Sequence, residues 1–314
     1  MRSDLQTVAV VGAGSIGCSW AALALGHGIP VHLADPADTA RDRAVETVRA
    51  HLTALSASAD LMDGLHLHAD PAEAAATADL VIEAGPERLD FKRELFAALD
   101  AATEPDVVLA SSSSGFGPSS FQDACRHPDR VVVAHPFNPP HLIPLVEVVG
   151  GASTSPETVE AVMASMRQLG RRPIRVRAEL PGHVVNRLQA ALWREAYDLI
   201  GRGAISVTDL DLAVSNGPGL RWALLGPIAT QHLSGGPGGM AHVLEHLGPP
   251  MVDWWADLGA PELTPELTGQ LVSGVTAELA GTEDQVRLDR DQALQELLAL
   301  KARLGLDPSH GDAR

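Results

Sequence analysis

His135 and Glu147 are the two residues whose types and setting best suit proton transfer. The apolar run 131–134 predicts a buried strand that ends at His135, and the run 145–149 predicts a second strand that carries Glu147. An imidazole held by a buried carboxylate is a general base that works near neutral pH. The same two residues would equally suit a solvated surface histidine and a glutamate at a strand edge, so the pair alone leaves both interpretations open.

Other polar side chains follow strand ends or open a helix. Four serines, residues 111–114, come directly after the apolar run 107–110. Ligands of open α/β sheets bind at the carboxyl ends of the strands, so we expect these serines and His135 to face one crevice. A serine run is also common in plain turns. Asn186 follows the hinge Pro181-Gly182 and is expected in the first turns of a helix, near the crevice mouth.

A nucleotide-binding turn is predicted at Gly12-Ala13-Gly14-Ser15-Ile16-Gly17, between the first strand and the first helix. The first glycine makes the tight turn, the second admits a pyrophosphate, and the third lets helix and strand pack closely. The start of the helix then supplies free amides. Asp35 ends the second strand, where a carboxylate would bind the ribose hydroxyls and repel a 2′-phosphate, so NAD is favoured over NADP; Arg41 and Arg43 lie nearby.

The order of the predicted elements defines the fold class. Short, uniformly apolar runs alternate with helical patterns as far as 176, which predicts a mostly parallel, Rossmann-type α/β sheet covered on both faces. Beyond a hinge at 178–182 the strand signal disappears. We therefore predict an NAD-binding domain over residues 1–180 and an all-helical domain over residues 181–314.

Composition excludes several classes of protein. A net charge of −17 argues against nucleic acid, whose binders need a basic face, and against anionic membranes. No apolar stretch approaches the length that spans a bilayer. Cys18 and Cys125 are two isolated thiols, typical of a reducing compartment, and no room for a signal peptide precedes the first strand. These features predict a cytoplasmic location.

The motifs together resemble the 3-hydroxyacyl-CoA dehydrogenase superfamily, over nearly the whole chain. The resemblance implies that hydride passes from the hydroxyl-bearing carbon of a substrate to NAD. It implies His135 as the base, Glu147 as the residue that orients it, and Ser114 and Asn186 as ligands of the substrate oxygen. It also implies that Glu83 and Lys92 lie near the cofactor. Where the family usually has phenylalanine, this chain has His183.

The substrate class depends on the branch of the family. Acyl-CoA enzymes carry a long, basic helical excursion after the second strand, whereas the segment 37–64 here is short and holds several acids. Motifs such as His135-Pro-Phe-Asn-Pro-Pro more closely resemble the lambda-crystallin branch. That branch includes L-gulonate 3-dehydrogenase and acts on free hydroxy acids. Arg221 is predicted to bind the substrate carboxylate as a bidentate pair. Trp222 beside it could suit a quaternary ammonium such as that of carnitine, but a place in the core or in a subunit interface is the favoured interpretation.

The resulting hypothesis is an NAD-dependent dehydrogenase of a small, free, L-gulonate-like 3-hydroxy acid. The alternatives are an L-3-hydroxyacyl-CoA or carnitine-type dehydrogenase, and a non-catalytic, crystallin-like protein that only binds NAD. His242 and His246 have the i, i+4 spacing of some metal sites, but no third ligand is evident and no metal is predicted. The resemblance further implies a homodimer formed through the C-terminal helical domain.

Overall fold

The computed structural model describes residues 5–306, and contacts divide the chain into two compact units, residues 1–187 and 188–314. The sequence predicts the boundary earlier, after residue 180. The division falls later because the first turn of helix α6 (Val185–Gly201) is bound to the first unit. The amide of Val185 donates to Glu147, and the side chain of Asn186 donates to the carbonyl of Ser114.

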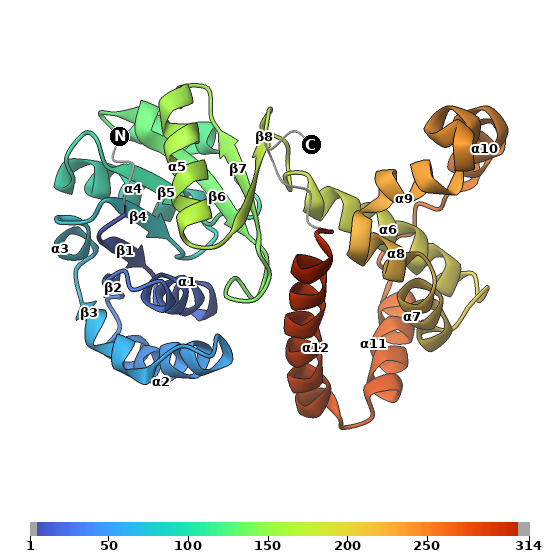
Figure 1. Cartoon of the computed structure of the whole chain (residues 1–314), viewed down its shortest axis with the longest axis horizontal. Helices are drawn as coiled ribbons and strands as arrows, with labels where there is room; N and C mark the ends of the chain where they lie inside the picture. The colour runs from blue at the N-terminus through green and yellow to red at the C-terminus, as the bar shows by residue number, and fades with distance from the viewer. Residues whose placement is uncertain (1–4, 307–314) are drawn as a thin grey trace. The chain divides into compact units, whose positions relative to one another are not determined.

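The first unit is the predicted Rossmann-type domain (Figure 1). In its described part, eight strands form one sheet in the order β3-β2-β1-β4-β5-β6-β7-β8. All neighbouring pairs are parallel except β6 and β7, which are antiparallel. The strands are β1 (Val8–Val11), β2 (Val31–Ala34), β3 (Leu65–His68), β4 (Leu80–Glu83), β5 (Val108–Ser111), β6 (Val131–Pro136), β7 (Leu145–Gly150) and β8 (Arg172–Val176).

Helices cover both faces of this sheet, because successive strand residues point to opposite faces and nearly all are apolar. Val8 and Val10 of β1 join the core under α1, α2 and α5, while Ala9 and Val11 join the core under α3 and α4. The helices of this unit are α1 (Ser15–Gly26), α2 (Asp38–Ala54), α3 (Pro71–Ala75), α4 (Leu89–Ala102) and α5 (Pro156–Gln168).

The antiparallel pairing of β6 with β7 positions His135 and Glu147. The strands are joined by residues 137–144, which include a cis peptide bond between Asn138 and Pro139. Arg171 holds this connection by donating to the carbonyls of Pro140 and Ile143. In the resulting register His135 lies directly opposite Glu147. Side chains paired in this way share one face of the sheet, so the two residues are within reach of each other.

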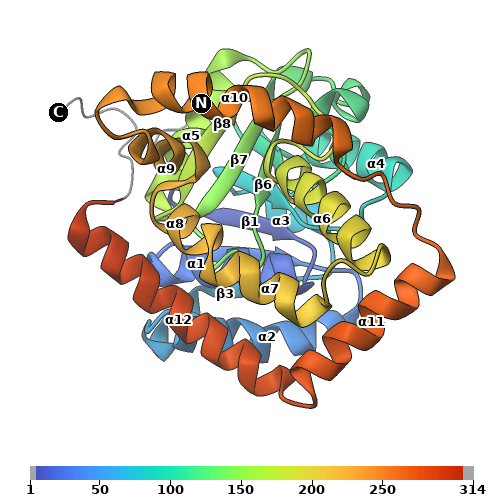
Figure 2. The ribbon, with the colours of Figure 1, turned by 90° about the vertical axis from the view of Figure 1, so that its right-hand side faces the viewer.

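The second unit is helical throughout its described part (Figure 2). Ser206 caps α7 by accepting a hydrogen bond from the amide of Asp209. The glycine-rich segment 234–239 forms only a short turn before α10. The helices are α7 (Val207–Asn216), α8 (Pro218–Leu225), α9 (Pro227–Ser234), α10 (Gly239–Asp257), α11 (Pro265–Leu279) and α12 (Glu283–Leu304).

Apolar side chains of the second unit are mostly exposed. Within its described residues only Ala196, Ile200, Val243 and Leu267 are buried apolar side chains, whereas Trp254 and Trp255 are 59% and 63% exposed. Apolar patches of this kind are usually covered by another surface. Among residues 5–306, no helix is both long and apolar enough to cross a membrane.

Candidate active site

The glycine turn after β1 contains glycines of two kinds. Gly12 has a φ of +109°, and a Cβ there would lie 2.6 Å from the carbonyl oxygen of Ala84. A Cβ on Gly17 would lie 1.8 Å from the carbonyl oxygen of Gly12, so packing of α1 against the turn requires glycine. A Cβ on Gly14 would meet no protein atom within 4 Å. The open side of Gly14 therefore faces space that a ligand can occupy, as the pyrophosphate-binding interpretation requires.

The start of α1 completes this anion-binding arrangement. Gly14 is the N-cap residue and no side chain caps the helix, so the amides of Ser15 and Ile16 in its first turn are available to a ligand. A helix N-terminus without a side-chain cap, next to a glycine with free space beside it, fits the pyrophosphate of a dinucleotide. The residues present therefore fit NAD.

Asp35, at the end of β2, is held in the same region. One of its carboxylate oxygens accepts from the amide of Ala13 in the glycine turn, and the other accepts from the amide of Ala37, each at 3.0 Å. Arg41 donates to the carbonyl of Asp35 and pairs with Asp38, so its guanidinium is occupied by protein groups. These contacts agree with a ribose-binding carboxylate and leave Arg41 poorly suited to a 2′-phosphate.

His135 and Glu147 form a direct hydrogen bond. The His135 Nδ1 and Glu147 Oε2 atoms are 2.9 Å apart, and both side chains are buried. Because a carboxylate only accepts, Nδ1 carries the hydrogen and Nε2 is the nitrogen able to take a proton. Burial alone would raise the pKa of the Glu147 carboxyl, but the hydrogen bonds from His135 and the amides of Val184 and Val185 outweigh burial and lower it. Glu147 is therefore ionised at neutral pH.

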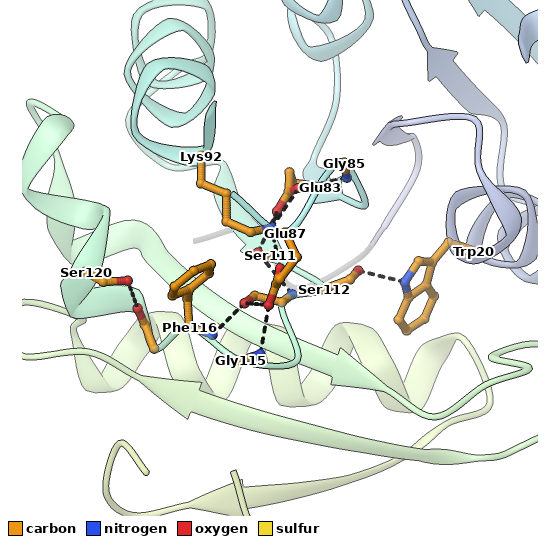
Figure 3. Close-up of polar contacts among 12 residues, drawn as sticks. Trp20, Glu83, Gly85, Glu87, Lys92, Ser111, Ser112, Gly115, Phe116 and Ser120 are labelled. Carbon is orange, nitrogen blue, oxygen red and sulfur yellow. Dashed lines mark hydrogen bonds and ion pairs between the residues drawn. The ribbon is translucent and has the colours of Figure 1, made fainter. Parts of the chain in front are cut away.

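A buried ion pair anchors the start of the serine loop, residues 111–114. Lys92 lies 2.9 Å from Glu83 Oε2 and both side chains are fully buried (Figure 3). The hydroxyl of Ser111 donates to the same carboxylate, and the amide of Gly85 donates to its other oxygen. Glu83 and Lys92 thus fix the end of β5, from which the serine loop begins.

Glu87 is a second anchor of this loop that was not predicted from the sequence. It lies 3.2 Å from Lys92 and accepts hydrogen bonds from the Ser113 hydroxyl and the Gly115 amide (Figure 3). Burial would raise the pKa of the Glu87 carboxyl, but these bonds and Lys92 lower it. Its signal in the sequence is its place in the short loop 84–88 after Glu83, at the carboxyl end of β4.

Ser114 and Asn186 come together although they are far apart in the sequence. The Asn186 side-chain nitrogen lies 3.5 Å from the Ser114 carbonyl oxygen. His183 donates from Nε2 to the carbonyl of Ser113, and its ring centroid is 5.2 Å from that of His135. The serine loop, the 182–186 turn and the His135–Glu147 pair therefore meet at one place. Ser114 itself is exposed.

Arg221 lies in the second unit, on α8, and is exposed. The rings of His242 and His246 on α10 are tilted by 43° with their centroids 4.0 Å apart, and the Nδ1 of His246 bonds the carbonyl of His242. No group of three or more metal-ligating side chains suited to an ion occurs among residues 5–306.

Comparisons with known proteins agree with this description. Residues 7–179 match the family model for the 3-hydroxyacyl-CoA dehydrogenase NAD binding domain, and residues 182–269 match the model for the C-terminal domain of the same family. An L-carnitine dehydrogenase of Nocardiopsis dassonvillei is 44% identical, over 96% of both chains. A 3-hydroxyacyl-CoA dehydrogenase of Gibberella moniliformis is also 44% identical, over 97% of both chains.

A solved structure supports the same conclusion. The NAD+ dependent 5-formyl-3-hydroxy-2-methylpyridine 4-carboxylic acid 5-dehydrogenase is 30% identical and has a TM-score of 0.76, with 98% of this chain and 100% of that chain covered. The fold and the relatives define an NAD-dependent dehydrogenase that acts on a CH–OH group. Within that class, the chain belongs to the 3-hydroxyacyl-CoA dehydrogenase family.

The contrast between the glycines gives a first prediction. Gly14→Ala should raise the dissociation constant for NAD by roughly tenfold or more, because the added methyl enters the space meant for the pyrophosphate. Its melting temperature should stay that of the wild type. Gly17→Ala should instead lower the melting temperature, since its Cβ meets backbone. Calorimetric NAD titration and thermal unfolding measure both; an unchanged affinity in Gly14→Ala would refute the assignment.

The hydrogen-bonded pair gives a second prediction. Glu147→Gln should lower kcat by about 10²–10⁴-fold, because an amide that donates to His135 Nδ1 would put the imidazole in the wrong tautomer for a base. NAD affinity should be retained. Glu160→Gln, the same change at an exposed ion pair with Arg175, is the matched control. A Glu147→Gln enzyme with kcat close to that of the control would show that Glu147 does not orient the base.

Proposed function

We propose that this protein oxidises the hydroxyl of a small, free 3-hydroxy acid to the corresponding 3-oxo acid, with NAD as the acceptor. The observation that carries the proposal is the buried His135–Glu147 hydrogen bond of 2.9 Å beside the serine loop. NAD, when bound, accepts a hydride from the hydroxyl-bearing carbon. His135 takes the hydroxyl proton on Nε2 as the carbon–oxygen double bond forms. The alcohol thus loses a hydride from its carbon to NAD and a proton from its oxygen to His135, which balances two electrons and two hydrogens.

The neighbouring residues would support this proton transfer. Glu147 stays ionised and stabilises the imidazolium that forms on His135. Ser114 and Asn186, which are joined by a long hydrogen bond, are the proposed ligands of the substrate oxygen. Arg221 is the residue proposed for the substrate carboxylate, since its planar guanidinium can bind a carboxylate through two hydrogen bonds. Membership of an enzyme family favours turnover over a non-catalytic, crystallin-like role.

A free acid is favoured over a CoA thioester by helix α2. This helix contains arginines but no lysine, and acids are interspersed among them. Arg41 is already occupied by Asp35 and Asp38, and Arg43 donates to the carbonyl of Thr39. A helix in which two of the three arginines are engaged in this way is a poor site for CoA phosphates. Because one relative is named 3-hydroxyacyl-CoA dehydrogenase, a CoA thioester is the alternative substrate to test.

Two free acids fit the proposal for different reasons. L-Gulonate fits because motifs around His135 resemble the lambda-crystallin branch. Carnitine, also a 3-hydroxy acid, fits because several relatives that are 41–44% identical are named L-carnitine dehydrogenases. The exposed Trp222 beside Arg221 would suit its quaternary ammonium through cation–π attraction.

A substrate panel tests the proposal. Purified enzyme with NAD should produce NADH from at least one of L-gulonate, L-carnitine and 3-hydroxybutyrate, followed by absorbance at neutral pH. The methyl ester of the active acid should lose at least about tenfold in kcat/KM, because the carboxylate no longer pairs with a cation. Turnover of 3-hydroxybutyryl-CoA with all free acids inert would replace the free acid by the thioester. Inertness of every compound would refute both.

We also propose a homodimer formed through the second unit, in the cytoplasm. The exposed apolar side chains of α10, including Trp254 and Trp255, support a second copy as the covering surface. The free, buried thiols of Cys18 and Cys125 are compatible with a reducing compartment.

Sedimentation measures this association. The wild type should sediment at about twice the 32.9 kDa mass of one chain, and Trp255→Glu should sediment as a monomer, because a charge would be buried in the interface. Leu67→Glu, at an exposed position on β3, is the control and should remain dimeric. A monomeric wild type at micromolar concentration would contradict the proposal.

A further inference from the structure

His183 is a second histidine beside the base, in a strained turn between β8 and α6. Gly182 and His183 have φ angles of 72° and 51°, in the left-handed region that side-chain-bearing residues rarely adopt. The side chain of His183 is nonetheless fully buried. A costly backbone conformation that buries a polar ring needs a physical reason.

The two ring nitrogens of His183 have different surroundings. Nε2 lies 3.1 Å from the carbonyl oxygen of Ser113, and a carbonyl only accepts, so Nε2 carries the hydrogen. In the neutral ring Nδ1 is then a lone-pair acceptor. It is buried, and it has no hydrogen-bond partner among the described residues. A buried acceptor left in this state destabilises the protein unless a donor pairs with it.

The ring stays neutral because of where it lies. Burial lowers the pKa of His183, and the positive charge that His135 carries when protonated lowers it further. The carbonyl of Ser113 and the carboxylates of Glu147 and Glu87 act in the opposite direction but do not reverse the shift. Nδ1 therefore remains an acceptor while His135 gains and loses its proton.

The ring that carries the unpaired nitrogen lies beside the proposed base. The ring of His135 lies 5.2 Å from that of His183 and 5.1 Å from that of Phe137. His135 is itself only 6% exposed, so a substrate hydroxyl that reaches it enters an equally enclosed space. An apolar ring, that of Phe137, and a ring with an unpaired acceptor, that of His183, therefore both lie beside the base.

We propose that His183 is a specificity-determining residue whose Nδ1 accepts a hydrogen bond from a second hydroxyl of the substrate, on a carbon next to the one oxidised. The inference rests on the proposed function and narrows its substrate class to polyhydroxylated 3-hydroxy acids. Carnitine has no hydroxyl besides the reacting one, so it would leave Nδ1 unpaired. A site built around an acceptor discriminates strongly against analogues that lack the donor.

Substrates that differ by one hydroxyl test this directly. The wild-type enzyme should use 2,3- or 3,4-dihydroxybutyrate with a kcat/KM about tenfold or more above that for 3-hydroxybutyrate. In His183→Phe, which keeps a ring but has no acceptor, the ratio should fall to within about twofold, because only the hydrogen bond is lost. His66→Phe, the same change at an exposed residue of β3, should keep the wild-type ratio.

The outcomes separate this inference from the proposed function. If no hydroxy acid is oxidised, the proposed function fails. If the acids are oxidised without preference for the second hydroxyl, or His183→Phe keeps the preference, the inference fails alone. If His183→Phe loses only NAD affinity, the group that donates to His183 Nδ1 belongs to the cofactor and not to the substrate. That result would also overturn the inference.

A binding measurement on the wild-type enzyme tests the same hydrogen bond even if His183→Phe does not fold. In wild-type enzyme loaded with NADH, the ¹⁵N resonance of His183 Nδ1 should shift when dihydroxybutyrate is added, since accepting a hydrogen bond changes its shielding. It should not shift with 3-hydroxybutyrate. Equal responses to the two acids would overturn the proposal.

Discussion

The carboxylate of Glu147 is the group on which the arrangement of the site depends. One of its oxygens accepts from His135, and the other accepts from the amides of Val184 and Val185. A buried carboxylate is stable only when its oxygens are satisfied in this way. Glu147 thereby ties together two antiparallel strands and the first turn of α6. The same three bonds that stabilise its charge also set the tautomer of the base.

The serine loop is positioned by a separate set of charges that reaches the same place. The buried Glu83–Lys92 pair fixes the end of β5, and Glu87 binds the loop through Ser113 and Gly115. His183 then joins the loop to the turn that holds Glu147. Because Glu83, Lys92 and His183 are buried, and all four anchors including the more exposed Glu87 are hydrogen-bonded, the site is largely formed before any ligand binds. This is the condition for electrostatic catalysis.

The two units meet the demands of folding differently. The first has apolar cores on both faces of its sheet, so it can hold polar groups rigidly at the strand ends. The second has few buried apolar side chains among its described residues and many exposed ones. A helical unit of this kind gains stability by covering its apolar faces with another surface. The proposed dimer and the proposed catalysis thus rest on different physical features of one chain.

Local patterns in the sequence determined the fold class, the glycine turn, Asp35 and the family, because strands, helices and the turn are encoded by residues close together in the chain. The same patterns singled out His135 and Glu147 but did not show whether the two side chains are solvated or buried together. Only the tertiary structure shows them buried and paired, since the antiparallel register of β6 with β7 sets the two side chains face to face. The anchoring by Glu87 and the unpaired nitrogen of His183 also depend on it. Their partners come from distant segments, and such contacts arise from packing, which no local spacing records.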